Sequence, residues 1–294
     1  MEKEIPNLLF KSESSEISDI EIIALEKIKE GKDSFTHSPE KAHQLEFYQL
    51  AFYTEGVSEQ LVDFVWYKVQ KNTVIYVSKG QVNAFKFNKD LKGYLILFTE
   101  DYLKRQLAKI PKNTAIRLLT PQLFSPMVQV TQTSNLPEYV QLIFREFYKT
   151  TESFNKKYII DSLFSIIFSK VEEIKKNETD YIKDSEKLTL FLKFQAKLKK
   201  TFVTNKNAVF YANELGVTYK HLNVVVKEVI NKTAKQYIDE FVILEAKRNL
   251  VNSTIKSTEL SYLMGFEEST NFVKYFKKRT GLTPNEFKKS YIRT

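Results

Sequence analysis

Two short stretches in the C-terminal part of the chain share one pattern. The first is Tyr211-Ala212-Asn213-Glu214-Leu215-Gly216-Val217, and the second, 49 residues further on, is Leu260-Ser261-Tyr262-Leu263-Met264-Gly265-Phe266. Each contains a small residue, a glycine four positions later, and then an apolar residue. In a helix-turn-helix the small residue lets the second helix cross the first closely, and the glycine adopts the backbone conformation of the turn. The repeat therefore predicts two helix-turn-helix units, over about residues 207–229 and 256–279.

The residues that follow each glycine predict the second helix of each unit. Apolar positions match between the copies: Leu222, Val225 and Val226 in the first, and Phe272, Tyr275 and Phe276 in the second. Lysine follows in both, at Lys227 and at Lys277-Lys278, so each second helix buries one face and shows a basic or polar one. Residues 234–252 are expected to form one long helix that holds the units apart. The run Thr283-Pro284-Asn285-Glu286 supplies an N-cap, a proline at the first helical position and the glutamate of a capping box.

The net positive charge of the 294-residue chain lies in this same part. Residues 181–294 contain 21 Lys+Arg and 11 Asp+Glu, a net charge of +10, whereas residues 1–180 contain 24 and 25, a net charge of −1. This segregation indicates that the C-terminal part meets a polyanion and that the N-terminal part is an ordinary globular unit. A lysine-rich surface kept for solubility is the alternative, but it does not account for the segregation.

The composition argues against most enzyme classes. There is no cysteine, and the three histidines, His37, His43 and His221, leave little for metal binding or histidine-dependent catalysis. No apolar run approaches the length of a membrane span, and the charged start Met1-Glu2-Lys3-Glu4 lacks the apolar region of a signal peptide. We therefore expect a cytoplasmic protein without catalytic residues, cofactor or metal, and without a membrane partner.

Glycine and proline mark a change of architecture near residue 137. Residues 138–215 contain neither, and six of the seven prolines come before residue 138. Residues 45–98 carry short aromatic and β-branched runs separated by turn residues, which predict a small antiparallel sandwich or barrel. After residue 137, apolar residues recur at helical spacings, which predicts two amphipathic helices before the polar stretch near residue 177.

The segment from about residue 185 to 291 resembles the DNA-binding domain of the AraC/XylS family of bacterial transcription regulators. The resemblance is carried by residues 211–218, by residues 244–250 (Leu244-Glu245-Ala246-Lys247-Arg248-Asn249-Leu250), by Gly265-Phe266, Phe272 and Phe276-Lys277-Lys278, and by the closing run of residues 280–287. The chain departs from the family at Ser261, where alanine is common, and at Val224, where many members carry an arginine that faces DNA.

The N-terminal part resembles the sensor arm of the same family, a cupin-like β-barrel, through residues 43–56, Asp63, and residues 74–82 and 93–98. Cupin enzymes bind metal through clustered histidine and glutamate side chains. Here Asn83 occupies the place where a histidine is expected, and His43 and Glu46 alone cannot complete a metal site.

Together these features predict an α+β chain of three parts. Residues 1–136 form a cupin-like antiparallel β-barrel that acts as the sensor domain, residues 137–180 a helical dimerisation and linker segment, and residues 181–294 an all-α DNA-binding domain. The resemblance implies a sequence-specific transcription regulator that responds to a small organic effector in the barrel, with operator DNA and RNA polymerase as partners. A helical interaction or structural protein is the alternative, and a cupin-type enzyme is a distant third.

The expected DNA-contacting positions lie on the second helix of each unit. They are Tyr219, Lys220, Asn223, Val224 and Lys227 in the first unit, and Ser269, Thr270, Asn271 and Lys274 in the second, followed by Lys277, Lys278 and Arg279. We expect Asn223 and Asn271 to pair with adenine, Lys220 or Lys274 to contact guanine, and the remaining cations to hold phosphates. Each is alternatively a solvated surface residue. Because both units lie on one rigid chain, they should enter successive major grooves roughly 34 Å apart.

Aromatic residues suggest two further sites in the N-terminal part. Residues Phe144, Phe147, Phe164, Ile167 and Phe168 predict a homodimer contact, with a core between domains as the competing interpretation. Residues His43, Phe47, Gln49, Trp66, Tyr76, Lys79 and Phe85 are the candidate lining of an effector pocket, with a barrel filled by its own side chains as the alternative. An aromatic lining favours an apolar or ring-bearing molecule, whose polar or carboxylate end His43, Gln49 or Lys79 would orient.

Overall fold

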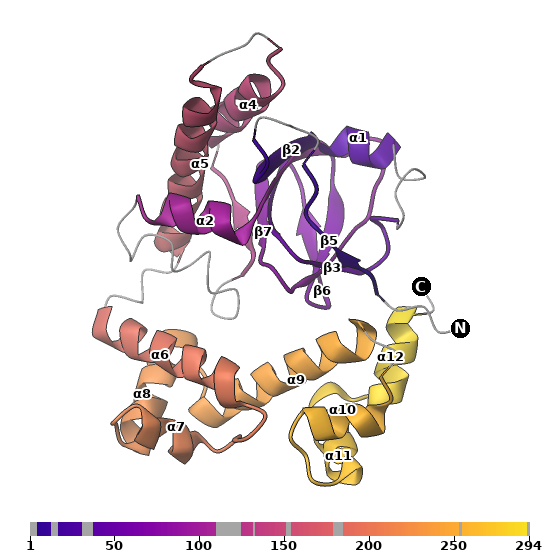
Figure 1. Cartoon of the computed structure of the whole chain (residues 1–294), viewed down its shortest axis with the longest axis vertical. Helices are drawn as coiled ribbons and strands as arrows, with labels where there is room; N and C mark the ends of the chain where they lie inside the picture. The colour runs from indigo at the N-terminus through magenta and orange to yellow at the C-terminus, as the bar shows by residue number, and fades with distance from the viewer. Residues whose placement is uncertain are drawn as a thin grey trace. The chain divides into compact units, whose positions relative to one another are not determined.

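A computed structural model of the chain describes residues 5–12, 17–30, 38–109, 125–131, 133–150, 154–178, 185–252 and 255–292. The chain divides into two compact units (Figure 1). One unit spans Pro6–Glu178, and the other comprises Met1–Ile5 with Thr179–Thr294. Among the described residues, no helix combines the length and the apolar character that crossing a membrane requires.

The N-terminal unit is built on two five-stranded sheets, whose strands run in colour from indigo to magenta in Figure 1. The first sheet has the order β1-β3-β8-β5-β6, from strands Asn7–Leu8, His43–Leu45, Val82–Phe85, Ser58–Val62 and Val65–Val69. The second has the order β10-β7-β4-β9-β2, from strands Met127–Gln129, Thr73–Val77, Tyr48–Glu55, Lys92–Phe98 and Ile20–Ala24. All pairs are antiparallel except β1 with β3, which is parallel, so the expected antiparallel barrel is confirmed apart from this one edge.

Strand alternation divides the apolar residues of this unit between two cores. Along β4, Leu50 and Phe52 belong to one buried cluster, whereas Ala51 and Tyr53 belong to another. The second cluster takes residues from both sheets and lies between them, since successive side chains of a strand point to opposite faces. The short helix α1 (Leu25–Glu30) contributes Leu25 to it.

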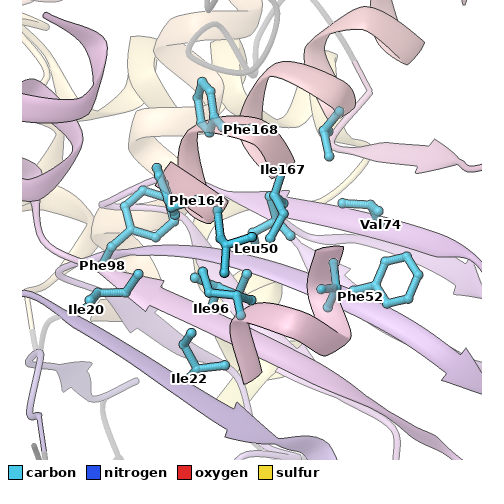
Figure 2. Close-up of a cluster of buried hydrophobic side chains, with 14 of the residues drawn as sticks. Ile20, Ile22, Leu50, Phe52, Val74, Ile96, Phe98, Phe164, Ile167 and Phe168 are labelled. Atoms are coloured by element: carbon cyan, nitrogen blue, oxygen red, sulfur yellow. The ribbon is translucent and has the colours of Figure 1, made fainter. Parts of the chain in front are cut away.

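Helices cover the other face of the second sheet. They are α2 (Glu100–Leu107), α4 (Leu136–Phe147) and α5 (Lys156–Glu178). Figure 2 shows Phe164, Ile167 and Phe168 of α5 above the sheet residues Leu50 and Ile96. The rings of Phe98 and Phe164 meet edge to face, with centroids 4.9 Å apart. This layer forms the larger of the two apolar clusters of the unit. It removes Leu50, Phe52 and Ile96, which lie on this face of the sheet, from contact with water.

This layer corrects the expected dimer contact. Phe147, Phe164, Ile167 and Phe168 are at most 8% exposed, and Phe144 packs its ring against Tyr94, with centroids 4.7 Å apart. Phe147, Phe164, Ile167 and Phe168 are core residues of their own unit, so the predicted contact with a second chain through them is wrong, and Phe144 is partly buried against that core. The competing interpretation expected these aromatic residues to form a core between domains. They do form a core, but it lies between the helices and the sheet of the same unit.

The C-terminal unit is a set of seven helices among its described residues. They are α6 (Ser185–Thr201), α7 (Ala208–Glu214), α8 (Tyr219–Ile230), α9 (Ala234–Asn252), α10 (Ser257–Leu263), α11 (Ser269–Thr280) and α12 (Pro284–Ile292). The long central helix α9 buries apolar side chains on several sides, among them Tyr237, Phe241 and Leu250. It contacts α7 and α8 of the first repeat and α10 of the second, and therefore joins the two copies.

The capping box expected before α12 is confirmed. The Thr283 backbone N–H donates to Glu286 Oε2 at 2.7 Å, and the Glu286 backbone N–H donates to Thr283 Oγ1 at 3.3 Å. The Thr283 backbone N–H and the Thr283 hydroxyl, which donates to Glu286 Oε2 at 2.8 Å, lower the pKa of the Glu286 carboxyl, since both hydrogen bonds favour its charged form. The cap fixes where the last helix begins.

Candidate nucleic-acid interface

The two helix-turn-helix units have the same turn. Gly216 and Gly265 adopt φ of 69° and 73°, the left-handed region that the sequence pattern requires of them. In the first copy the Val217 N–H donates to the Ala212 carbonyl at 3.0 Å, and in the second the Phe266 N–H donates to the Ser261 carbonyl at 2.9 Å. The predicted repeat is therefore confirmed at the level of individual hydrogen bonds.

The small residue of each pattern lies where two helices pack. Ala212 and Ser261 are both fully buried. The hydroxyl of Ser261 donates to the Thr258 carbonyl at 2.6 Å, so serine replaces alanine here without leaving a buried polar group unsatisfied. Serine at position 261, where alanine is common in the family that the sequence resembles, therefore preserves the packing of the two helices as well as the small size of the side chain.

The second helix of the first copy, α8, buries one side and exposes the other. Leu222, Val225, Val226 and Val229 are its buried residues. Tyr219, Lys220, Val224 and Lys227 are exposed, as the sequence predicts. Thr218 caps the helix through a hydrogen bond from the His221 N–H at 3.1 Å, so the exposed side begins at a fixed point. His221 is itself an exposed helix-surface residue, as expected.

Asn223 departs from its expected role. Its side-chain oxygen accepts a hydrogen bond from the backbone N–H of Ala234 at 2.9 Å, at the first residue of α9. Pairing with adenine uses the amide oxygen and nitrogen together, and here the oxygen satisfies an otherwise unpaired donor of a helix start. Asn223 therefore joins α8 to α9, and the engagement of its oxygen argues against the predicted pairing with adenine, which stays a prediction to be tested.

The second helix of the second copy, α11, presents the corresponding side. Phe272 and Phe276 are buried, whereas Thr270, Asn271, Lys274, Lys277 and Lys278 are exposed and Ser269 is half-buried. Among the described residues, Lys220, Lys227, Lys274 and Lys278 form no ion pair, although many other lysines of the chain do. The exposed sides of both helices thus hold cations that have no acidic partner within the described part of the chain.

Arg279 is different, because α9 holds it. Its guanidinium donates to Asp239 Oδ2 at 2.5 Å and lies 3.6 Å from the ring centroid of Tyr275, whose hydroxyl donates to Asp239 Oδ1 at 2.7 Å. Burial raises the pKa of the Asp239 carboxyl, but hydrogen bonds from Lys235, Arg279 and Tyr275 together lower it below its ordinary value. Arg279 therefore fastens α11 to the central helix, and its contact with a phosphate stays a prediction, since the side chain is still partly exposed.

The second turn also packs against the loop that precedes the first copy. Gly265 lies so close to the loop after α6 that a Cβ there would be 1.7 Å from the Val203 carbonyl oxygen. Lys206, from the same loop, donates to the Gly265 carbonyl at 3.3 Å, and its ammonium lies 4.7 Å from the Phe266 ring centroid. Burial and the neighbouring Lys235 lower the pKa of Lys206. Sequence patterns do not predict this contact between the second turn and the loop after α6.

The structure separates the residues expected to line an effector pocket. Phe47 and Phe85 lie in the core between the sheets. Tyr76 lies on the other face, against Phe168 of α5, because residues of opposite parity in a strand face opposite ways. Trp66 is exposed beneath the ammonium of Lys86 at 4.5 Å. The assignments of Tyr76 and Trp66 to a pocket inside the barrel are therefore wrong.

Lys79 and His43 also differ from their expected roles. Lys79 is exposed and pairs with Glu46 and Glu100, at 3.6 and 3.8 Å. His43, expected at a pocket mouth, is 2% exposed; its Nδ1 lies 2.9 Å from the Lys41 carbonyl and its Nε2 lies 3.1 Å from Asn83 Nδ2. Gln49 is buried, as a pocket-lining side chain would be. His37 lies outside the described residues.

A buried polar chain runs through this unit that the sequence analysis missed. Tyr53 donates to Gln60 Oε1 at 2.8 Å, Gln60 donates to Asn83 Oδ1 at 2.6 Å, and the Asn83 amide meets His43. The available signal was the presence of Gln60 and Asn83 at inward positions of otherwise apolar strands. Within the ranges that the structure describes, no three His, Asp or Glu side chains lie close enough together to hold a metal ion.

Comparisons with known proteins agree with the helical unit. Residues 211–290 match the family described as helix-turn-helix domain. An uncharacterised HTH-type transcriptional regulator of Pseudoalteromonas carrageenovora is 33% identical over 94 residues, which are 32% of this chain and 55% of that protein. The Msm operon regulatory protein of Streptococcus mutans is 22% identical over 170 residues, 57% of this chain and 55% of that protein.

The chain thus spans about half the length of these curated relatives. A solved structure of ToxT from Vibrio cholerae aligns over 92% of this chain and 98% of that chain, with a TM-score of 0.48 and 13% identity. The matched family segment covers α8 to α11 completely, together with the turns and the exposed lysines described above. Residues 211–290 of this chain are therefore similar to the helix-turn-helix domain family, over the same helices that carry the repeated turn.

Proposed function

We propose that this chain is a sequence-specific DNA-binding transcription regulator. The observation that carries the proposal is the repetition of one geometry. Each of the two helix-turn-helix units exposes lysines on the side of its second helix opposite the core, and these lysines have no acidic partner among the residues that the structure describes. Cations so placed can contact phosphates and base edges in the major groove. One central helix joins the units, which suits them to successive grooves of one duplex.

A gel-shift titration of the full-length chain tests this function. The probe is a duplex from the promoter region of the gene that encodes the chain, and the control is a scrambled duplex of equal length and composition. A sequence-specific regulator binds the promoter duplex ~10³-fold more tightly or better. Its affinity falls steeply with salt, because cations of the protein displace counterions from the phosphates. Equal affinity for both duplexes would favour the alternative of a helical interaction protein.

The remaining partners follow from this function. Bound at a promoter, such a regulator acts on RNA polymerase, and it works in the bacterial cytoplasm, where the DNA is. The function requires no catalysis and no cofactor.

The proposal includes a homodimer formed through the exposed face of α5. The core residues of that helix are unavailable, but Tyr158, Ile159 and Ile166 on its outer side are 70%, 37% and 38% exposed. An isologous contact of this face would give four helix-turn-helix units to a repeated operator. Sedimentation of the full chain with Ile159→Lys and Ile166→Lys together tests it. The pair should convert a dimer into a folded monomer, and an unchanged sedimentation coefficient would contradict this contact.

The proposal also includes a small organic effector for the N-terminal unit. The amide Nε2 of Gln49 is buried and has no hydrogen-bond partner among the described residues, and a buried donor of this kind is satisfied by a ligand or a water molecule. An effector that binds the folded chain raises its thermal stability by an amount set by its concentration over its dissociation constant. A screen of metabolites against the full-length chain, by thermal unfolding and then by operator affinity, tests this part. Hits that stabilise the chain without changing operator affinity would refute a regulatory role.

A further inference from the structure

The exposed sides of α8 and α11 differ at one position of the repeat. When the buried residues of the two helices are matched, Lys227 corresponds to Lys277, and Val224 corresponds to Lys274. Lys220 and Lys227 lie four residues before and three residues after Val224, so all three share one face of α8. The first copy therefore presents an apolar side chain between two cations, where the second copy presents another cation.

Val224 takes no part in the core of the domain. It is 42% exposed, whereas Leu222, Val225 and Val226 around it in sequence are fully buried. Its neighbour Asn223 is held by the start of α9 through its side-chain oxygen. The centre of the exposed side of α8 thus offers an apolar surface. The Asn223 amide beside it has its oxygen engaged, so in this conformation it cannot pair with a base through both its oxygen and its nitrogen.

Only one base presents an apolar group in the major groove, and that group is the C5-methyl of thymine. We propose that the first helix-turn-helix recognises thymine through contact between Val224 and this methyl group, with Lys220 and Lys227 placing the helix against the adjacent backbone or bases. The inference rests on the proposed function, since it names what one of the two units reads. It also distinguishes the copies: the first reads partly by apolar contact, and the second by hydrogen bonds from Lys274 and Asn271.

Removal of single thymine methyl groups from the DNA tests this contact directly. The probe is the duplex that the full-length chain selects from a randomised pool, resynthesised with each thymine replaced in turn by deoxyuridine, which removes only the methyl group. At one or two thymines the parent should lose affinity about fourfold, the effect expected for burying one methyl group. With Val224→Ala, which shortens the apolar side chain, the same replacement should have a clearly smaller effect, while Lys274→Ala, the matched variant in the second copy, should keep the fourfold loss.

Each outcome decides the question. The inference is overturned if no deoxyuridine replacement weakens binding, or if the Val224→Ala chain stays as sensitive to them as the parent. Val224 is on the surface, and circular dichroism and thermal unfolding of the variant establish that its fold is unchanged. A chain that selects a sequence but shows no Val224-dependent methyl effect refutes this inference alone, whereas a chain that selects no sequence refutes the proposed function with it.

Discussion

Arg279 of α11 donates a hydrogen bond of 2.5 Å to Asp239 of α9, and the same carboxylate accepts from Tyr275 and Lys235. The second recognition helix is therefore fastened to the helix that also carries the first copy. Asp239 is partly buried and negatively charged, and its partners come from both helices. Its protonation should loosen the second copy from the central helix.

The first prediction concerns acid stability. The folded-state pKa of Asp239 lies below its ordinary value of 3.8, so the stabilisation is fully present above that pH and is lost as pH falls through the lower, folded-state value. Asp239→Asn should lower the free energy of unfolding at neutral pH by ~1–3 kcal/mol, since Arg279 loses its charged partner. Urea titrations at pH 7 and at pH 3 measure this. The difference between parent and variant should shrink at the lower pH, and a constant difference would contradict the assignment.

The second prediction compares the two turn glycines. Both have positive φ, so alanine at either position costs ~1–2 kcal/mol in backbone strain. At Gly216 a Cβ would meet nothing within 4 Å, whereas at Gly265 it would collide with the Val203 carbonyl. Gly265→Ala should therefore destabilise the chain by a further ~1–3 kcal/mol, the usual cost of overpacking. Chemical unfolding of the two variants side by side checks this, and equal losses would show that the loop after α6 moves away freely.

The third prediction concerns the two kinds of DNA contact. Lys274 lies in the middle of the exposed side of α11 and Lys278 toward its end, and both are without an ion pair within the described part of the chain. Lys274→Ala should cost ~1–3 kcal/mol of binding and relax the preference at one base pair. Lys278→Ala should weaken all sequences alike and lower the salt slope by about one. Binding of the parent and both variants to a panel of single-base operator changes measures this; identical preferences in all three would refute the base contact.

The fourth prediction concerns Asn223. Because its side chain satisfies the N–H of Ala234, Asn223→Ala should lower the free energy of unfolding by ~1 kcal/mol, as the loss of a helix cap does. Sequence preference should not change, since the side chain reads no base. Selection from a randomised pool by parent and variant tests the second half of this statement. A shift in the selected sequence at an adenine would restore Asn223 as a base contact.

The fifth prediction concerns two neighbouring isoleucines of α5. Ile167 is 1% exposed and packs on the sheet, while Ile166 is 38% exposed on the opposite side. Ile167→Ala should cost ~2–5 kcal/mol of stability, and Ile166→Ala less than about 1 kcal/mol. Unfolding by urea at low protein concentration, where association contributes little, separates the two effects. If both variants lost the same stability, the division of α5 into a core side and an outer side would be wrong.

The sequence contained enough to predict the helical unit almost to the residue. Turn glycines, helix caps and apolar spacing are local signals, because each determines the backbone conformation at its own position. Gly216, Gly265 and the Thr283 cap therefore adopt the conformations that the sequence predicts. The contacts that Asn223 and Arg279 make within the domain could not be predicted from such local signals. Both residues are of types that contact DNA, and only the position of α9 shows that a backbone N–H and Asp239 already engage them.

The N-terminal unit was predictable in architecture but not in the use of its aromatic residues. Alternation along a strand shows that Tyr76 and Ile75 face opposite sides, but not which side is the interior of the barrel and which is covered by α5. In the same way, helical periodicity shows that Phe164 and Phe168 share one face of α5, but not whether that face packs on the sheet or on a second chain. What decides between these interpretations is the pairing of β4 with both β7 and β9, a long-range fact that periodicity does not contain.

The buried polar chain from Tyr53 to His43 limits the ways in which the strands can align. It joins β4 of one sheet to β5, β8 and β3 of the other, and in the last pair His43 stands directly opposite Asn83. Sliding β8 by a single residue would turn Asn83 outward, leaving Gln60 and His43 surrounded by hydrocarbon without their shared partner. Valine and leucine in those places would tolerate several alignments almost equally. The four polar side chains therefore favour one strand alignment over the others, which gives the unit a single well-defined native state.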